Sequence, residues 1–345
     1  MISRTARATA AAAAVLLSAA PPVGAQTATG ASGLRVVDRI AGPDGGWDYA
    51  GFDPARRRVY VAHGMQVTAI DADTRKVTAT FAAGNHLHAV LLIPGQDLLL
   101  TTNSGDDSAR LYNAASGALV ASIRTAKDPD AAIFDGLSGL AYVMGGESGT
   151  ITVINVKKAK AVGSIAVGGA LEFAALDGKG RLFVNREDKA DIAVVDVATR
   201  KVTGHYPLAG CGGPTGLAYV QGGRLISACM TGVAKILDAA TGREIASLKI
   251  GPRPDAVIYD AARGLAYIPS AIPGALAVIA LSGAANNTII DTVPTQAGAR
   301  TGALDEKTGR IYLPTADYGP PPTAGGRPTV KPGTFTVLVL DRPPA

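Results

Sequence analysis

Three of the four histidines lie close together in the sequence, beside acidic residues that recur along the chain. Imidazole nitrogens and carboxylate oxygens bind divalent cations, and the same groups transfer protons. His63, His86 and His88 are therefore candidate metal ligands, while His86, His88 and Arg300 are candidate catalytic residues. No recognised ligand spacing such as His-Glu-Xaa-Xaa-His is present, so solvated loop histidines or histidines with structural hydrogen bonds are the alternative.

The candidate acids occupy equivalent positions of an internal repeat. One template fits Asp48-Tyr-Ala-Gly-Phe-Asp53, Asp130-Ala-Ala-Ile-Phe-Asp135, Glu172-Phe-Ala-Ala-Leu-Asp177 and Asp255-Ala-Val-Ile-Tyr-Asp260, and weaker copies begin at His88, Thr215 and Arg300. The seven starts are about 42 residues apart on average, a period typical of β-propeller blades. Asp and Thr are also common turn formers, so capping of turns is the competing interpretation.

Each repeat contains four short apolar runs separated by turns, which predicts an all-β protein with seven blades of four antiparallel strands. The last repeat ends one strand short, at residues 336–341. Residues 34–40 near the N-terminus supply an apolar run that could complete it. Pairing the two ends closes the ring and removes free sheet edges, so we expect the N-terminal strand to close the last blade.

The second strands Val59-Tyr60-Val61 and Ala141-Tyr142-Val143, with turns such as Asp73-Thr74-Arg75-Lys76, resemble the YVTN-repeat β-propeller family. The resemblance covers essentially the whole mature chain. It implies architecture rather than chemistry, because this family includes binding proteins, surface proteins and relatives of enzymes. The sequence departs from the pattern at residues 226–229 and 268–270, and by a long insertion in blade 7.

In a propeller, the loops that enter the first strands share one face around the central channel. This register places a set of candidate ligand-binding residues there: Trp47, Asp48, Asp130, Glu172, Arg186, Arg253, Asp255 and Tyr318. Trp47 could stack on a ring or plug the space between blades, and the arginines could hold an anion or form salt bridges. Tyr318 belongs to the Pro-rich segment 316–334, which is either a lid or disordered.

The N-terminus predicts export. Arg4 and Arg7 precede a short apolar run and a small-residue site at Val23-Gly24-Ala25, which together indicate a signal peptide over residues 1–25. The mature chain, residues 26–345, is then a single propeller domain in the periplasm or secreted, without membrane insertion. We expect Cys211 and Cys229 to form a disulfide there, because their loops approach the same face.

Removal of Arg4 and Arg7 from the 33 basic residues leaves 31 against 28 acidic ones, a net charge of about +3. The basic turns lack interleaved aromatic residues, which argues against a nucleic-acid partner.

Three functions fit this sequence. The first is a monomeric exported protein that binds a small ligand, a divalent metal ion or a protein at the channel-face loops. The second is a hydrolase or lyase that acts on a lactone, sugar or related acid through the His/Asp/Glu cluster. The third is a structural scaffold for protein interactions.

Overall fold

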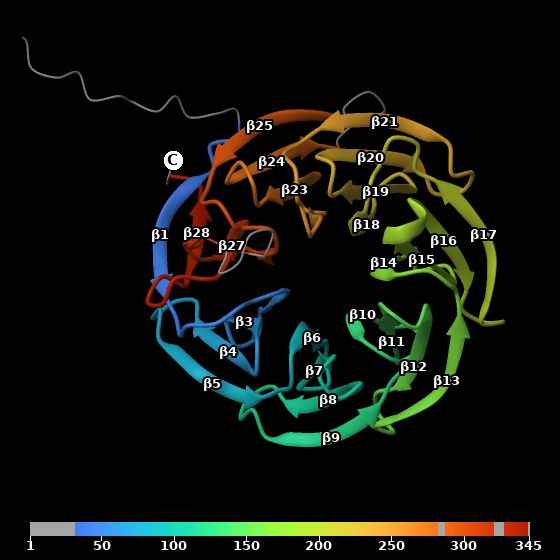
Figure 1. Cartoon of the computed structure of the whole chain (residues 1–345), viewed down its shortest axis with the longest axis horizontal. Coiled ribbons are helices and arrows are strands. Elements are labelled where there is room, and N and C mark those ends of the chain that lie inside the picture. Colours follow the sequence, from blue (N-terminus) through green and yellow to red (C-terminus); the bar gives the residue numbers. More distant parts are fainter. Residues whose placement is uncertain (1–31, 282–286, 321–327, 344–345) are drawn as a thin grey trace, which may run out of the picture.

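The computed structural model describes residues 32–281, 287–320 and 328–343, and it confirms the seven-bladed β-propeller (Figure 1). Seven four-stranded antiparallel sheets are arranged in a ring around a central channel. The predicted signal peptide, residues 1–25, lies outside the described residues. Within the described ranges, no helix has the length and apolar character needed to cross a membrane.

Blades 1 to 4 follow the chain order from the channel outward. Blade 1 is β2 (Ala50–Asp53), β3 (Arg58–His63), β4 (Gln66–Asp71) and β5 (Val77–Ala83). Blade 2 is β6 (Leu87–Ile93), β7 (Leu98–Asn103), β8 (Ser108–Asn113) and β9 (Leu119–Arg124). Blade 3 is β10 (Pro129–Asp135), β11 (Leu140–Gly145), β12 (Thr150–Asn155) and β13 (Lys160–Ala166). Blade 4 is β14 (Leu171–Leu176), β15 (Arg181–Arg186), β16 (Asp191–Asp196) and β17 (Lys201–Pro207), with the 3-10 helix η1 (Glu187–Lys189) between β15 and β16.

The last three blades complete the ring. Blade 5 is β18 (Pro214–Val220), β19 (Arg224–Cys229), β20 (Val233–Asp238) and β21 (Glu244–Lys249). Blade 6 is β22 (Ile258–Asp260), β23 (Leu265–Ser270), β24 (Ala275–Ala280) and β25 (Thr288–Pro294). Blade 7 is β26 (Ala303–Asp305), β27 (Arg310–Thr315), β28 (Thr336–Asp341) and, outermost, β1 (Arg35–Ala41).

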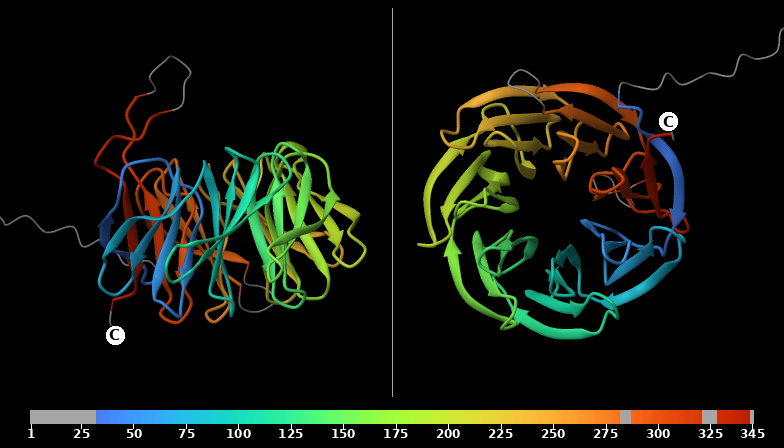
Figure 2. Two further views of the ribbon diagram at one scale, coloured as in Figure 1. Left: turned by 90° about the horizontal axis from the view of Figure 1, so that it is seen from below. Right: turned by 180° about the vertical axis from the view of Figure 1, so that it is seen from behind.

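The predicted closure of the last blade is confirmed. β1 pairs antiparallel with β28, from Arg35 opposite Asp341 to Ala41 opposite Thr336. The two ends of the described chain therefore lie side by side at one point of the ring (Figures 1 and 2). This pairing joins strands from opposite ends of the sequence, so no first or last blade is left with an incomplete sheet.

The hydrophobic core lies between neighbouring blades. The second and third strands of each blade are buried on both faces, because each sheet packs against a neighbour on either side, whereas the outermost strands alternate between exposed and half-buried residues. The tyrosines of four second strands, Tyr60, Tyr142, Tyr267 and Tyr312, are almost fully buried. Blade-to-blade packing of this kind makes a rigid ring whose loops can vary.

In four blades, an aspartate at the end of the first strand holds the turn that follows it. Asp53 accepts hydrogen bonds from the backbone of Ala55 and Arg56 at 2.9 and 3.1 Å, and from the Arg56 guanidinium at 3.0 Å. Asp177, Asp260 and Asp305 make comparable bonds at the equivalent position. These acids are structural, since each is paired with an arginine and with turn N–H groups.

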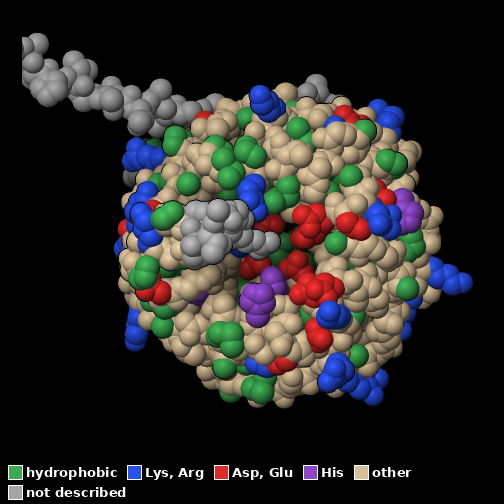
Figure 3. All heavy atoms as spheres, viewed as in Figure 1, with side chains coloured by type: hydrophobic (Ala, Val, Ile, Leu, Met, Phe, Trp, Pro, Cys, Tyr) green, Lys and Arg blue, Asp and Glu red, His purple; other side chains and the backbone are tan. Residues whose placement is uncertain are grey.

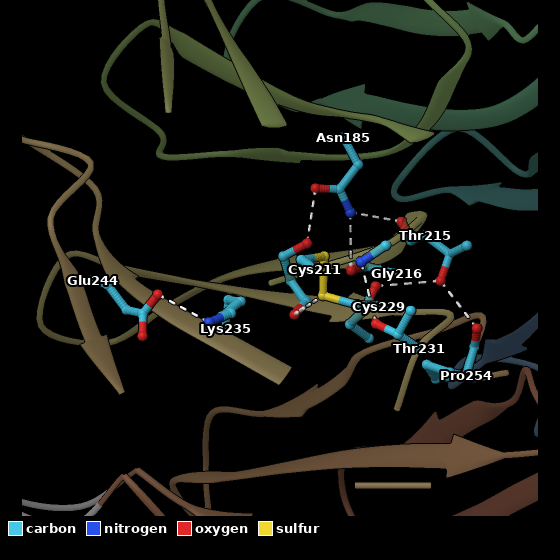
Figure 4. Close-up of a disulfide and its surroundings, with 12 residues drawn as sticks. Asn185, Cys211, Thr215, Gly216, Cys229, Thr231, Lys235, Glu244 and Pro254 are labelled. Atoms are coloured by element: carbon cyan, nitrogen blue, oxygen red, sulfur yellow. Dashed lines mark hydrogen bonds and ion pairs between the residues drawn. A yellow bond between two sulfur atoms is a disulfide. The ribbon is translucent and has the colours of Figure 1, made fainter. Parts of the chain in front are cut away.

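The Cys211–Cys229 disulfide is also confirmed, with the two Cα atoms 5.4 Å apart (Figure 4). It ties the loop before β18 to the end of β19. Beside it, Asn185 of blade 4 donates hydrogen bonds to Thr215 O and Gly216 O at 2.8 and 3.1 Å. At the channel face, the disulfide therefore holds the loop before blade 5 against that blade, and the Asn185 amide joins blade 4 to blade 5.

Candidate functional site

Acidic side chains gather around the central opening on one face of the ring, with histidine beside them (Figure 3). They stand at or just before the start of the innermost strands. Backbone and side-chain hydrogen bonds fix these starts to the adjacent blades: Tyr49 N donates to His88 O at 3.0 Å, and Thr301 Oγ1 donates to Asp48 O at 2.7 Å. We call Asp48, His88, Asp130, Glu172, Asp255 and Arg300 the channel mouth.

His88 lies between two carboxylates at the channel mouth. Its Nδ1 is 2.8 Å from Asp48 Oδ2 and 3.6 Å from Asp130 Oδ1. Its Nε2 is 3.1 Å from the Ser104 hydroxyl oxygen. One ligand atom from each of Asp48, His88 and Asp130 falls within 4.8 Å of the other two, a spacing that could hold one cation. Imidazole suits Zn²⁺, and carboxylate oxygens suit Zn²⁺ and the harder ion Mn²⁺.

Arg300 supplies the opposite charge on the far side of the mouth. Its Nε donates to Asp255 Oδ2 at 2.9 Å and its Nη2 to Trp47 O at 2.7 Å, while Asp48 Oδ1 lies 3.7 Å away. The guanidinium also stacks over the Trp47 ring, with Cζ 5.6 Å from its centroid. Arg300 is thus held by groups of the protein, and it neutralises Asp255 more directly than Asp48.

Two aromatic rings form the floor of the mouth. Tyr49, 7% exposed, packs against Phe173 with ring centroids 5.2 Å apart. Below them, toward the opposite face, a cavity of about 620 Å³ is lined mostly by apolar residues of the first strands. Tyr49 and Phe173 also border this cavity, so the rings separate an acidic compartment from an apolar one.

The carboxyl groups of the mouth are held in an unfavourable environment for negative charge. Burial and the nearby Asp48 charge raise the pKa of Asp130 to about 8, although His88 opposes the change. Burial and Asp48 likewise raise the pKa of Asp255 to about 6 against the effect of Arg300. Burial, followed by Asp130 and Asp255, raises the pKa of Glu172 well above its ordinary value. Desolvation and mutual repulsion both favour the protonated acids.

The same burial and acidic charges change the pKa values of His88 and Tyr49. Burial alone would lower the pKa of His88, but the hydrogen bond to Asp48 and the charges of Asp130 and Asp48 raise it to about 9. Burial raises the pKa of the Tyr49 hydroxyl, and the charges of Asp255, Asp130, Glu172 and Asp48 raise it further. The mouth therefore favours the positive charge of His88.

The acidic region extends outward from the mouth between blades 3 and 4. A cavity of about 490 Å³ opens there, which we call the blade 3–4 groove. Asp130 and Glu172 belong to both the mouth and the groove. The other charged residues lining it are Asp128, Glu147, Glu187, Asp188 and Lys189.

The structure brings only part of the predicted histidine cluster together. His63, 2% exposed, points into the interface with blade 7, where its ring lies 4.2 Å from that of Phe335 and its Nδ1 is 3.2 Å from Thr68 Oγ1. Burial lowers its pKa. As the last residue of β3, His63 belongs to the second strand, one layer outside the channel. The predicted convergence of all three histidines is therefore wrong for His63.

His86 is exposed beside the mouth. Its Nδ1 is 2.6 Å from Ser104 Oγ, and its ring lies edge-on to that of His88 with centroids 5.0 Å apart. Ser104 thus links the two imidazoles. His86 is adjacent to the cluster of Asp48, His88 and Asp130 but contributes no atom to it.

Four other predicted binding residues have structural partners or lie apart. Arg186 forms a two-pronged salt bridge with Asp191, at 2.7 and 2.6 Å, which is the alternative foreseen for it. Trp47 is buried against Phe335 and Tyr318, with centroids 5.5 and 6.1 Å away, and so acts as a plug rather than an open stacking platform. Tyr318 is partly exposed over Trp47, and Arg253 is exposed at the face.

Sequence reasoning assigned no role to Tyr49, Ser104 or the outer acids of the groove. A signal for Tyr49 was present in the repeat: the residue after each start is Tyr49, Ala89, Ala131, Phe173, Gly216, Ala256 or Thr301. Two large rings among five small residues can fill a channel that the small residues leave open. Comparison of that position across the seven repeats would have indicated the floor.

Comparison with known proteins supports the fold. No family model matches the chain, and no curated protein sequence does either. Among solved structures, "Kuenenia stuttgartiensis Hydrazine Synthase" is similar with a TM-score of 0.70 at 16% identity, covering 85% of this chain and 96% of that one. A chain of "Crystal Structure of Mitotic Checkpoint Complex" is similar with a TM-score of 0.74 at 14% identity, covering 97% and 98%. At such identities the likeness shows the propeller fold alone, and the resemblance to the YVTN-repeat family stays a prediction.

Proposed function

We propose that this propeller is a binding protein whose channel mouth takes a cation, with a divalent metal ion held by Asp48, His88 and Asp130. The observation that carries the proposal is the approach of Asp48, His88 and Asp130 from three blades, with one ligand atom of each within 4.8 Å of the other two, while Glu172 and Asp255 belong to the same mouth. Arg300 is the only arginine or lysine of the described chain that pairs with any of them. Buried charge requires a partner, and a bound cation would provide it.

The arrangement around His88 supports a metal at this position. Asp48 Oδ1 is buried without a hydrogen-bond partner among the described residues, so it keeps an unused acceptor. Nδ1 of His88 faces both carboxylates, and Nε2 faces Ser104, which could accept the remaining ring proton. A second partner of this kind orients a ligating imidazole and raises its basicity.

Calorimetric titration of the metal-free protein with Zn²⁺ and with Mn²⁺ tests the proposal. We expect one site per chain, lost or weakened at least about tenfold in His88→Ala, because that variant removes one of three ligands. His205→Ala is the matched control, since His205 lies on the outer strand β17 and should leave the titration unchanged. Equal affinity of wild type and His88→Ala for both ions would refute the metal site.

A hydrolase or lyase is the second candidate, and one geometric observation favours it. Asp48 Oδ2 lies 2.8 Å from Nδ1 of His88 and orients the ring, while Asp130 Oδ1 lies 3.6 Å from the same nitrogen. In this arrangement a carboxyl and an imidazole can exchange a proton with a ligand. A screen of lactones and sugar acids should then show turnover that Asp130→Asn abolishes. Turnover that survives this substitution would remove the acid–base assignment.

Residence in the periplasm or outside the cell forms part of the same proposal. Support comes from the predicted signal peptide and from a disulfide of the kind that persists in an oxidising compartment.

A further inference from the structure

Ser104, His88 and Asp48 form a hydrogen-bonded chain across the boundary between blades 1 and 2. Asp48 Oδ2 lies 2.8 Å from Nδ1 of His88, and Nε2 of the same ring lies 3.1 Å from Ser104 Oγ. A hydroxyl, an imidazole and a carboxylate joined through these same atoms make up the Ser-His-Asp triad of acyl-transferring enzymes, which recurs on unrelated folds. The order of these contacts, rather than any spacing along the chain, identifies the arrangement.

The hydrogen bonds determine which nitrogen of His88 carries the proton in the metal-free protein. A carboxylate only accepts hydrogen bonds, so Nδ1, which faces Asp48 Oδ2, is the protonated nitrogen. In the neutral ring Nε2 then has a free lone pair, which can accept the proton of the Ser104 hydroxyl. This is the tautomer in which a histidine acts as a base toward serine. A metal ion on Nδ1 requires the opposite tautomer, so the two uses of His88 exclude each other.

Ser104 Oγ has the contacts that a nucleophile needs. Its single proton has two acceptors within reach, His88 Nε2 at 3.1 Å and His86 O at 3.3 Å. Nδ1 of His86, at 2.6 Å, can donate to a lone pair of Oγ and so stabilise negative charge on that oxygen. The backbone N–H of Ser104 donates to His86 O at 3.0 Å, which fixes the position of the residue. Ser104 is partly exposed and His86 is exposed, so a molecule from solvent can reach the hydroxyl.

The pairing of serine with histidine occurs in blade 2 alone. Ser104 directly follows the second strand β7, and His88 stands at the start of this repeat. The starts of the other six repeats carry no imidazole. A contact required by the propeller itself would recur in several blades, as the aspartate at the end of the first strand does. The residues that follow the second strands of the other blades carry no hydroxyl: Gly64, Gly146, Glu187, Met230, Ala271 and Ala316.

We propose that the channel mouth hydrolyses carboxylic esters, with Ser104 as the nucleophile, His88 as the general base and Asp48 as a positioning residue. Ser104 Oγ attacks the carbonyl carbon while its proton passes to Nε2 of His88. The C–O bond to the alcohol breaks as that proton moves to the leaving oxygen. Water then attacks the acyl carbon and gives a proton to Nε2, and the acid leaves as this proton returns to Ser104 Oγ. This inference rests on the hydrolase named as the second candidate function, and it assigns the nucleophile.

Labelling with an alkyl fluorophosphonate tests the nucleophile on the full mature protein in EDTA. The reagent phosphonylates an activated serine and releases fluoride, and peptide mass spectrometry locates the modified residue. Burial lowers the pKa of His88, but Asp48 and Asp130 raise it to about 9, so labelling is measured at pH 9, where about half of the rings are neutral. Ser116, exposed in the turn after β8 of the same blade, is the internal control. We expect Ser104 to react at least about 100-fold faster than Ser116.

Ester hydrolysis at the same pH separates the three roles. Ser104→Ala and His88→Ala should each lower the turnover of p-nitrophenyl acetate at least about 100-fold. Asp48→Asn should lower kcat by a similar factor and leave KM within about twofold, because the amide keeps the shape of the side chain but holds the wrong tautomer of His88. Ser116→Ala is the matched control and should keep both values. Thermal melting of Ser104→Ala at the wild-type temperature separates a loss of rate from a loss of fold.

The outcomes separate this inference from the proposed functions. Equal labelling of Ser104 and Ser116, or labelling of Ser104 that persists in His88→Ala, overturns the triad, even where calorimetry shows metal binding. Ester or lactone turnover without labelling of Ser104 also overturns it and leaves a hydrolase of another mechanism. Labelling of Ser104 without a calorimetric response to either metal ion supports the triad and removes the metal site alone. Where both hold, Zn²⁺ should suppress the labelling, since the ion replaces the proton on Nδ1 of His88.

Discussion

Asp130→Asn should stabilise the metal-free protein while removing its capacity to hold a cation. Asparagine has the shape of the protonated acid and no charge, so it removes the repulsion between Asp130, Asp48 and Asp255. Residues placed for binding rather than for folding often destabilise the empty protein, and their replacement then raises stability. The sign of the change in the free energy of unfolding therefore distinguishes a functional acid from a structural one.

The magnitude follows from the pKa of Asp130. A rise from 3.8 to about 8 corresponds to at most ~6 kcal/mol of unfavourable free energy for the ionised form, at about 1.4 kcal/mol per pKa unit. The side chain keeps 19% of its exposure, and Asn would also remove a charge that stabilises protonated His88. We therefore expect a gain in the free energy of unfolding of roughly 2 kcal/mol at pH 8.

The gain should depend on pH with a defined sign. Because the folded pKa of Asp130 lies above its unfolded value, the folded protein keeps a proton that the unfolded chain releases between pH 4 and 8. The free energy of unfolding of the wild type therefore falls as the pH rises through this window, and the decrease is complete above about pH 8. Asp130→Asn has no such proton to release. The difference in the free energy of unfolding between this variant and the wild type should therefore be near zero at pH 4 and largest at pH 8.

Urea denaturation in EDTA at pH 4, 6 and 8 measures the effect. Asp53→Asn is the control, because Asp53 is 1% exposed and holds Arg56 and two backbone N–H groups. That variant should lose about 2 to 3 kcal/mol at pH 8, the cost of breaking a buried charge-assisted network. A loss of stability in Asp130→Asn at pH 8, or a gain that does not grow with pH, would refute the reasoning.

Three further outcomes are expected. Joint replacement of Cys211 and Cys229 by serine should lower the free energy of unfolding by about 3 kcal/mol, because the bond closes a loop of 18 residues; unchanged urea denaturation would contradict this. Arg300→Gln should lower the melting temperature at pH 8 and less so at pH 5, since the pKa of Asp255 is about 6 and its protonation removes the unpaired charge; an equal loss at both pH values would count against it. N-terminal sequencing of the exported protein should begin at Gln26, and a chain that retains residues 1–25 would exclude the predicted cleavage.

Much of the architecture could be read from the sequence because a propeller repeats one local unit. Asp48, Asp130, Glu172 and Asp255 mark the same point of four repeats, so their register alone predicted that they would share one face. The missing strand of blade 7 identified β1 as its partner, because an incomplete sheet leaves unpaired backbone groups. The disulfide followed from the same register, since the loop before a first strand and the end of the second strand meet at one face.

The residues that form the site depended on the directions in which side chains point, and the repeat does not specify those directions. His63 and His88 both lie in channel-face segments, yet one ring packs into a blade interface and the other faces the channel, because they belong to different strands of their blades. Arg186 had a local partner, Asp191, on the adjacent strand, and this pairing removed it from the set of free cations.

The sequence by itself determined the ring, the face that carries the acids and the strand that closes the last blade, because these follow from local periodicity and from backbone pairing. Only the tertiary structure decided that Asp48, His88 and Asp130 come within reach of one cation, that Tyr49 and Phe173 close the channel beneath them, and that the acids continue into a groove between blades 3 and 4. Those contacts join residues from different blades across the channel, and their distances depend on how the closed ring packs rather than on any spacing along the chain.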